Sequence, residues 1–196
     1  MVSLSQIVLA SGSTYRRALL ERLGVPFEWA APDVDESEIP GESTSETALR
    51  LAILKARTVA RRFPNAVVIG SDQVASCDDA RIGKPGNHAN AVKQLEFMSG
   101  KTALFQTALA VLVAATDEVR SRVVPCRVSF RPLTRTTIET YLKREQPYDC
   151  AGSAKAEGLG IALIARIETD DPTALIGLPL IALTELLSAV GIPVIG

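Results

Sequence analysis

Short aliphatic runs alternate with amphipathic stretches in the first 70 residues of the chain. Residues 6–10, apart from Gln6, and residues 66–69 are apolar and rich in branched side chains, which is typical of buried strands. Residues 14–23 and 43–63 repeat apolar side chains every three or four positions, as a helix with one buried face does. The pattern therefore predicts alternating strands and helices, with a further short strand at 27–31. Residues 74–77 either continue the strand at 66–69 beyond Gly70-Ser71-Asp72-Gln73 or pair with it.

Capping and breaking residues support these boundaries. Gly24 ends the first helix and Pro26 follows it, while Ser43 and Glu46 have the spacing of a capping box at the start of the second. Lys55 lies off the centre of the second helix's apolar stripe. That stripe consists of Ala48, Leu49, Ala52, Ile53, Ala56, Val59, Ala60 and Phe63.

The rest of the chain predicts more of both elements, and therefore an α/β protein. Two long apolar strands separated by a short polar turn are expected to form a hairpin. The predicted strands are 102–115, 119–130 and 161–167, and the predicted helices are 88–98, 134–144 and 180–190.

Composition narrows the function classes. The chain has 196 residues, of which 47% are hydrophobic, so it can bury a substantial core. Its 21 Lys and Arg against 22 Asp and Glu argue against a duplex-binding protein, which carries a basic excess. Three scattered cysteines and a single histidine argue against a zinc site. With no signal peptide pattern and no long apolar run, we expect a cytoplasmic protein without a membrane span.

The stretch "SGSTYRR" at 11–17 lies between the first strand and the first helix. Backbone N–H groups at a helix start favour an anion, and Ser11, Ser13 and Thr14 add hydroxyl donors. Arg16 can clamp phosphate oxygens with two parallel hydrogen bonds. The alternative is a capped surface helix with solvated arginines, and the junction alone does not decide between the two.

Carboxylates follow at two places. Asp72 is expected just past the end of a buried strand, where α/β sheets bind ligands, and it could bind a divalent metal or activate water. Asp35 and Glu36 lie in an acidic loop between two prolines and could share a hard cation such as Mg²⁺. The alternatives are an Asp that caps the next segment and a solvated acidic loop.

Lys55 and Lys84 are the cationic candidates beside these carboxylates. Lys84 stands in Gly83-Lys84-Pro85, which is not a Walker A loop because the upstream glycine and the following Ser or Thr are missing. Such a lysine can still hold a phosphate as a point charge. Taken singly, each can equally be a surface lysine.

The ordered set of fragments resembles a known family. The sequence contains, in order, "LASGSTYRRALLERLGVPFE", "DVDESE", "LAILKA", "VIGSDQV", "GKP", "YDCAGSAKAEGLG" and "LIGLPLIAL". This order and spacing resemble the Maf-like nucleoside triphosphate pyrophosphatases from about residue 7 to about residue 187.

The resemblance implies a single Maf-like domain over 1–196 with an elongated, mixed, twisted sheet, flanking helices and two lobes around a deep cleft. It implies hydrolysis between the α- and β-phosphates of a nucleoside triphosphate, with a divalent cation, Mg²⁺ or Mn²⁺. The roles it implies are phosphate binding by Ser11, Ser13 and Arg16, metal binding by Glu36 and Asp72, and catalysis by Asp72, Glu36, Lys55 and Lys84.

Three positions resemble the branch of the family that acts on 7-methyl-GTP. Tyr15, Gln73 and Glu157 stand where the dTTP and UTP branch has other residues. A methylated guanine carries positive charge, which an aromatic face and a carboxylate can recognise. The alternatives are a dTTP/UTP or broad non-canonical nucleotide pyrophosphatase, and a nucleotide-binding regulator without significant turnover. No stable nucleic-acid or membrane partner is expected, and family members often form homodimers.

Overall fold

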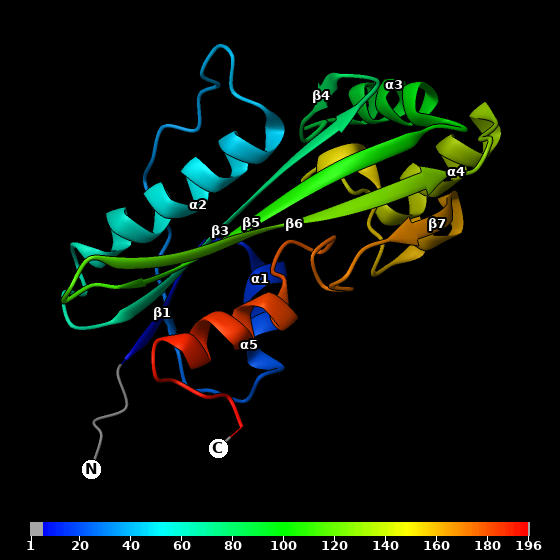
Figure 1. Ribbon diagram of the computed structural model, residues 1–196. Helices are drawn as coiled ribbons and strands as arrows, with labels where there is room; N and C mark the ends of the chain where they lie inside the picture. The colour runs from blue at the N-terminus through cyan, green and yellow to red at the C-terminus, as the bar shows by residue number, and fades with distance from the viewer. Residues whose placement is uncertain (1–5, 196) are drawn as a thin grey trace. The chain divides into compact units, whose positions relative to one another are not determined.

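The computed structural model describes residues 6–195 (Figure 1). Among these residues, strands form a seven-stranded sheet in the order β2-β1-β3-β5-β6-β7, with β4 paired to β3 off this path. The strands are β1 (Ile7–Ala10), β2 (Glu28–Trp29), β3 (Val67–Cys77), β4 (Ala80–Ile82), β5 (Thr102–Val113), β6 (Glu118–Phe130) and β7 (Ile164–Glu168). The helices are α1 (Thr14–Glu21), α2 (Thr44–Ala60), α3 (His88–Met98), α4 (Arg135–Glu145) and α5 (Leu180–Ala189).

The sheet is mixed, so the predicted α/β class with a mixed sheet and flanking helices is confirmed. β1 pairs in parallel with β2 and with β3, whereas β3 with β4 and β6 with β7 pair in antiparallel fashion. No helix in the range 6–195 is both long enough and apolar enough to span a membrane.

The chain divides into two compact units. Unit 1 contains the residues up to Gln73, Thr107–Val124 and the residues from Asp171 on, and unit 2 contains Val74–Gln106 and Pro125–Asp170. Strands β3, β5 and β6 contribute residues to both units. The interpretation of 1–196 as one domain stays a prediction.

In unit 1 both faces of the first strands are buried. Ile7 and Leu9 pack with side chains of α1 and α5, whereas Val8 and Ala10 pack with side chains of α2. Figure 1 shows α2 on one side of β1, and α1 and α5 on the other. A strand covered on both faces needs apolar residues at every position, which explains its unbroken apolar run.

Helix α2 has the predicted capping box, because Ser43 accepts from the Glu46 N–H and Glu46 accepts from the Ser43 N–H. The predicted apolar stripe is only partly right, since Leu49 and Ile53 are half-buried and Lys55 lies on the buried face. The buried residues of the helix are Thr47, Ala48, Leu51, Ala52, Lys55, Ala56 and Val59.

The third strand continues through 74–77, which is one of the two alternatives that the sequence leaves open, and it has no break at Gly70-Ser71. It runs through Gly70 and Asp72 to Cys77, so Asp72 lies within β3 and not beyond its end. Gly70 does not form a turn; its missing side chain leaves room for α2. A Cβ at Gly70 would lie 2.1 Å from the carbonyl oxygen of Ala52, so the glycine lets α2 pack directly on the strand.

Unit 2 differs from the prediction mainly at one strand. Leu159–Leu163 forms a 3₁₀ helix, and β7 begins only at Ile164, so the strand predicted at 161–167 is shorter and shifted. The two long strands β5 and β6 are neighbours in the sheet, as the predicted hairpin requires. Helix α3 has the predicted bounds.

Candidate active site

Lys55 connects two carboxylates within unit 1. Its Nζ lies 2.6 Å from Oδ1 of Asp72 and 2.6 Å from Oε1 of Glu36. The side chains of Lys55 and Asp72 are 8% and 9% exposed, whereas that of Glu36 is 60% exposed. The group therefore has a buried end on α2 and β3 and an accessible end on the loop before α2, where a ligand can approach.

The strand positions Asp72 toward α2. Successive side chains of a strand point to opposite faces, so Ser71 faces away from Asp72. The Ser71 hydroxyl lies 2.9 Å from the carbonyl oxygens of both Ala108 and Gly177, and these contacts fix this part of β3.

The pKa of the Asp72 carboxyl is raised, which makes its carboxylate a stronger base. Burial raises the pKa of its carboxyl, Lys55 and Arg16 lower it, and Glu36 raises it, with a net result above the ordinary value. Desolvation disfavours the charged carboxylate, which therefore accepts a proton more readily than an exposed aspartate does. A group of this kind can take a proton from water.

Arg16 on α1 is the second cation of the site. Its Nε donates to the carbonyl oxygen of Gly177 at 2.8 Å, and its charge acts on Asp72 and Glu36. Burial lowers the pKa of Arg16, and the charges of Asp72 and Glu36 raise it, with a net result below the ordinary value. In the described part of the chain no hydrogen bond joins its Nη atoms to another residue. Gly177 has φ +117°, and a Cβ there would lie 3.4 Å from the Arg16 Nε.

The serines of the "SGSTYRR" turn also have structural roles. Ser13 caps α1, with its hydroxyl 3.4 Å from the Arg16 N–H, and the Ser13 N–H donates to Ser11 Oγ at 3.1 Å. Each hydroxyl accepts in these contacts and keeps its own hydrogen for a further hydrogen bond. The second arginine of the stretch is used elsewhere, because the Arg17 guanidinium lies 4.2 Å from the centre of the Trp29 ring.

Of the predicted specificity residues, Gln73 is held within unit 1. Its Nε2 lies 2.8 Å from Thr107 Oγ1, 3.0 Å from the carbonyl oxygen of Ala174 and 3.1 Å from that of Leu175. The amide nitrogen therefore fastens the segment before α5 to the sheet. Tyr15 is half-buried on α1. Recognition of a base by these two residues stays a prediction.

The remaining candidates, Lys84 and Glu157, lie in unit 2, where both are exposed. The loop of Lys84 is well fixed. The carbonyl oxygen of Gly83 accepts from Gln94 Nε2 at 3.0 Å, and that of Pro85 accepts from Asn90 Nδ2 at 3.0 Å. The roles of Lys84 and Glu157 beside the residues of unit 1 stay predictions.

The donor set of unit 1 fits a divalent cation that a phosphate helps to bind. No three His, Cys, Asp or Glu residues between positions 6 and 195 are grouped so that they could hold a metal by themselves. Glu36 and Asp72 nevertheless place two hard oxygen donors on either side of one ammonium group. Mg²⁺ is commonly bound by one or two carboxylates together with waters and substrate phosphates.

Comparison with known proteins identifies the family of this chain. The sequence profile of a family described as Maf-like protein matches residues 6–190. The chain belongs to the Maf-like family. It is 57% identical to a 7-methyl-GTP pyrophosphatase of Thiobacillus denitrificans over 96% of this chain and 94% of that relative. It is 55% identical to a 7-methyl-GTP pyrophosphatase of Albidiferax ferrireducens over 97% of this chain and 96% of the relative.

Among solved structures, a HAM1 protein of Coxiella burnetii is similar with a TM-score of 0.45 and 18% identity, over 65% of this chain and 73% of the other. That similarity is too low to carry an argument about function.

Proposed function

We propose that this Maf-like protein hydrolyses 7-methyl-GTP to 7-methyl-GMP and pyrophosphate. The near full-length relatives that bear the name 7-methyl-GTP pyrophosphatase support this substrate. The observation that carries the chemistry is the buried Asp72 carboxylate, made more basic by its surroundings and held by Lys55 beside Arg16.

In the proposed reaction, Asp72 accepts a proton from water. The water oxygen forms a bond to one of the two phosphorus atoms that flank the α–β bridge, and the bridging P–O bond breaks. The electron pair of that bond stays with the leaving phosphate oxygen. Lys55 and the Nη atoms of Arg16 offset the negative charge on the phosphate oxygens. Positive groups at these oxygens lower the barrier because negative charge must be stabilised there in the transition state.

A divalent cation, Mg²⁺ or Mn²⁺, would be held by Glu36 and Asp72 together with the substrate phosphates. When bound, it neutralises phosphate charge and polarises the phosphoryl oxygens. Ser11 and Ser13 have hydroxyl hydrogens to donate to phosphate oxygens, and Lys84 supplies a further point charge in this proposal.

The base is proposed to be recognised by Tyr15, Gln73 and Glu157. The positive charge of a 7-methylguanine favours an aromatic face and a carboxylate, and a glutamate can accept from the N1–H and the N2 amino group. The three free cysteines suit a reducing cytoplasm, which is the proposed location. A homodimer stays a prediction.

The test is product analysis with a panel of nucleotides: 7-methyl-GTP, GTP, dTTP, UTP and CTP. Each is incubated with Mg²⁺, with Mn²⁺ or with EDTA, and monophosphate and pyrophosphate are separated and quantified. We expect both products in equal amounts, fastest from 7-methyl-GTP, and none with EDTA. Preference for dTTP or UTP would refute the proposed substrate, and binding without products would refute the proposed activity.

A further inference from the structure

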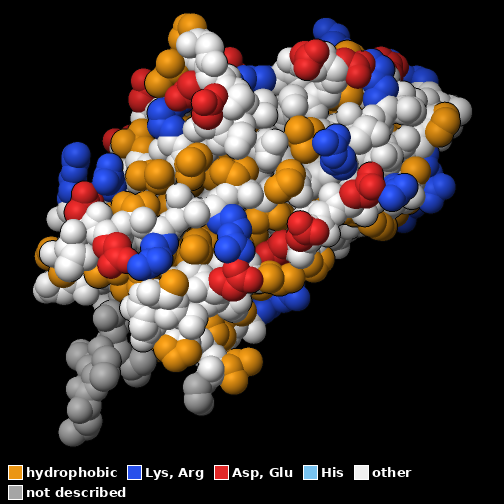
Figure 2. Space-filling view, viewed as in Figure 1, with side chains coloured by type: hydrophobic (Ala, Val, Ile, Leu, Met, Phe, Trp, Pro, Cys, Tyr) orange, Lys and Arg blue, Asp and Glu red, His pale blue; other side chains and the backbone are white. Residues whose placement is uncertain are grey.

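The loop that carries Glu36 lacks regular structure of its own. Residues 30–43 contain neither a helix nor a strand. In Figure 1 this loop, drawn in lighter blue, leads to the start of α2, and Figure 2 shows red carboxylate groups on the surface in this region. The exposed acidic residues of the loop are Asp33, Asp35, Glu36 and Glu38. Because no helix or strand hydrogen bonds hold this loop, side-chain contacts help to determine where Glu36 lies.

The ion pair with Lys55 is not enough by itself to hold the loop around Glu36. The Glu36 side chain is 60% exposed, and an ion pair with so exposed a partner contributes only about 0–1 kcal/mol. Ordering a single backbone residue costs roughly 1–2 kcal/mol, so the Lys55 contact alone does not hold a segment of this length.

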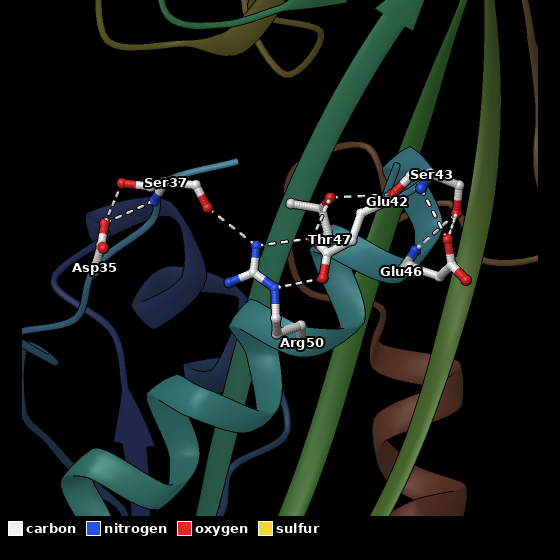
Figure 3. Close-up of polar contacts among 7 residues, drawn as sticks. All are labelled: Asp35, Ser37, Glu42, Ser43, Glu46, Thr47 and Arg50. Carbon is white, nitrogen blue, oxygen red and sulfur yellow. Dashed lines mark hydrogen bonds and ion pairs between the residues drawn. The ribbon is translucent and has the colours of Figure 1, made fainter. Parts of the chain in front are cut away.

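Arg50 supplies a stronger connection (Figure 3). Its Nε lies 2.7 Å from Glu42 Oε1 and its Nη2 lies 2.9 Å from Glu42 Oε2, which makes a two-pronged ion pair. The same Nη2 donates to the carbonyl oxygen of Ser37 at 3.1 Å. One guanidinium on α2 thus binds the loop directly after Glu36 and again at its end.

The acceptors of Arg50 are themselves fixed. Thr47 Oγ1 donates to Glu42 Oε2 at 3.0 Å, and the Ser37 N–H donates to Asp35 Oδ1 at 2.9 Å, in a turn that encloses Glu36. The Arg50 and Glu42 side chains are 26% and 18% exposed. Planar, two-pronged geometry in a half-buried place is the setting in which an ion pair determines position.

We propose that Arg50 is a positioning residue for Glu36. Arg50 and Lys55 lie five positions apart on the same helix: Arg50 holds the backbone next to Glu36, and Lys55 holds the carboxylate. This proposal rests on the proposed function, because it assigns Arg50 an effect on hydrolysis that passes through Glu36.

The test compares Arg50→Gln and Arg50→Lys with Arg57→Gln. Arg57 is the matched control, since it lies on the same helix, is 51% exposed and pairs with Asp117 at 3.0 Å. We expect Arg50→Gln to lower kcat for 7-methyl-GTP by on the order of tenfold or more, because small misplacements of catalytic groups are costly. Arg50→Lys should restore part of the loss, since lysine keeps the charge but not the fork. Arg57→Gln should stay within about twofold of wild type, as expected for an exposed pair.

A double-mutant cycle tests the route of the effect. If Arg50 acts through Glu36, then Arg50→Gln should change kcat little in a Glu36→Gln background. Equal losses in both backgrounds would overturn the proposal. So would an unchanged kcat in Arg50→Gln when Glu36→Gln loses activity. Wild-type kcat in Glu36→Gln would overturn it together with the role of Glu36 in the proposed function.

Hydrogen exchange of the peptide covering 33–42 tests whether Arg50 holds the loop separately from whether the protein hydrolyses a nucleotide, because exchange does not depend on turnover. Arg50→Gln should speed exchange at Ser37 and its neighbours, whereas Arg57→Gln should not. If wild type hydrolyses no nucleotide but this difference is found, the proposed function fails and the holding of the loop stands. Equal exchange in wild type and Arg50→Gln would show that Arg50 does not hold the loop.

Discussion

Lys55 Nζ and Asp72 Oδ1 lie 2.6 Å apart and join the buried face of α2 to the middle of β3. Glu36 completes the group from the loop before α2, with its Oε1 also 2.6 Å from the same nitrogen. One buried ammonium thus holds one buried carboxylate and one accessible carboxylate. The buried carboxylate of Asp72 is suited to accept a proton, and the accessible carboxylate of Glu36 is suited to bind a ligand from solvent.

Removing the charge of Lys55 should change the pH dependence of the reaction. Burial raises the pKa of Asp72 above its ordinary value, and the charge of Lys55 partly offsets this increase. Lys55→Met should therefore raise that pKa further. Because the deprotonated form of Asp72 accepts the proton, the acidic limb of the pH profile of kcat/KM should move to higher pH. Lys55→Arg keeps the charge and should move the limb less; equal limb positions in all three proteins would contradict this account.

Gly70 should be required for the distance between Lys55 and Asp72. A Cβ at this position would lie 2.1 Å from the Ala52 carbonyl oxygen, which belongs to the backbone of α2. Gly70→Ala should push the helix away, lower the free energy of unfolding by about 1–3 kcal/mol and lower kcat. Gly83→Ala is the stability control, because no atom lies within 4 Å of its added Cβ. Denaturant unfolding that is the same for both variants would refute the packing argument.

Gln73 should affect both stability and base preference. Gln73→Leu removes the donor shared by Thr107 and the carbonyl oxygens of Ala174 and Leu175, which should cost about 1–3 kcal/mol of unfolding free energy. The ratio of kcat/KM for 7-methyl-GTP over UTP should also fall. Gln6→Leu, which removes one exposed hydrogen bond to Glu28, should change neither quantity much. A lower stability with an unchanged ratio would make Gln73 a purely structural residue.

The sequence predicted most elements because local signals agree with the packing. The capping box at Ser43, the unbroken apolar run of β1 and the bounds of α3 follow from spacing alone. Asp72 was misplaced because Gly70-Ser71 has the composition of a turn. The glycine instead serves the close approach of α2, a tertiary contact that the local sequence does not contain.

The partners of the site residues were less predictable than the residues. Lys55 was placed off the centre of the apolar stripe. It is nevertheless buried, because carboxylates from the loop before α2 and from β3 neutralise its charge. The role of Arg50 was not predicted, since one arginine on an amphipathic helix is usually solvated. The available signal was Glu42 eight positions earlier, at the end of the acidic loop, but only the fold shows that the two side chains meet.

Replacing Asp72 should affect stability through two opposing effects, the raised pKa of its carboxyl and its ion pair with Lys55. Its pKa is raised in the folded protein, so the folded state binds this proton more tightly than the unfolded state. The resulting stabilisation is complete below the ordinary pKa of aspartate and is lost as the pH rises through the raised value. At neutral pH the raised pKa therefore gives no stabilisation, while Asp72→Asn takes one of two carboxylates from the buried Lys55. We expect Asp72→Asn to fold but to unfold at a lower Tm than wild type, and an unchanged Tm would contradict a stabilising ion pair.

The most direct measurement is the rate of pyrophosphate release from 7-methyl-GTP by wild type, Asp72→Asn and the exposed control Asp33→Asn, with Mg²⁺ at neutral pH. The account predicts a loss of roughly 10²–10⁴-fold in kcat for Asp72→Asn, the range for removal of a general base, with the fold intact. Asp33→Asn should keep wild-type kcat. Release by Asp72→Asn within a few-fold of wild type would contradict the assignment of Asp72 as the base.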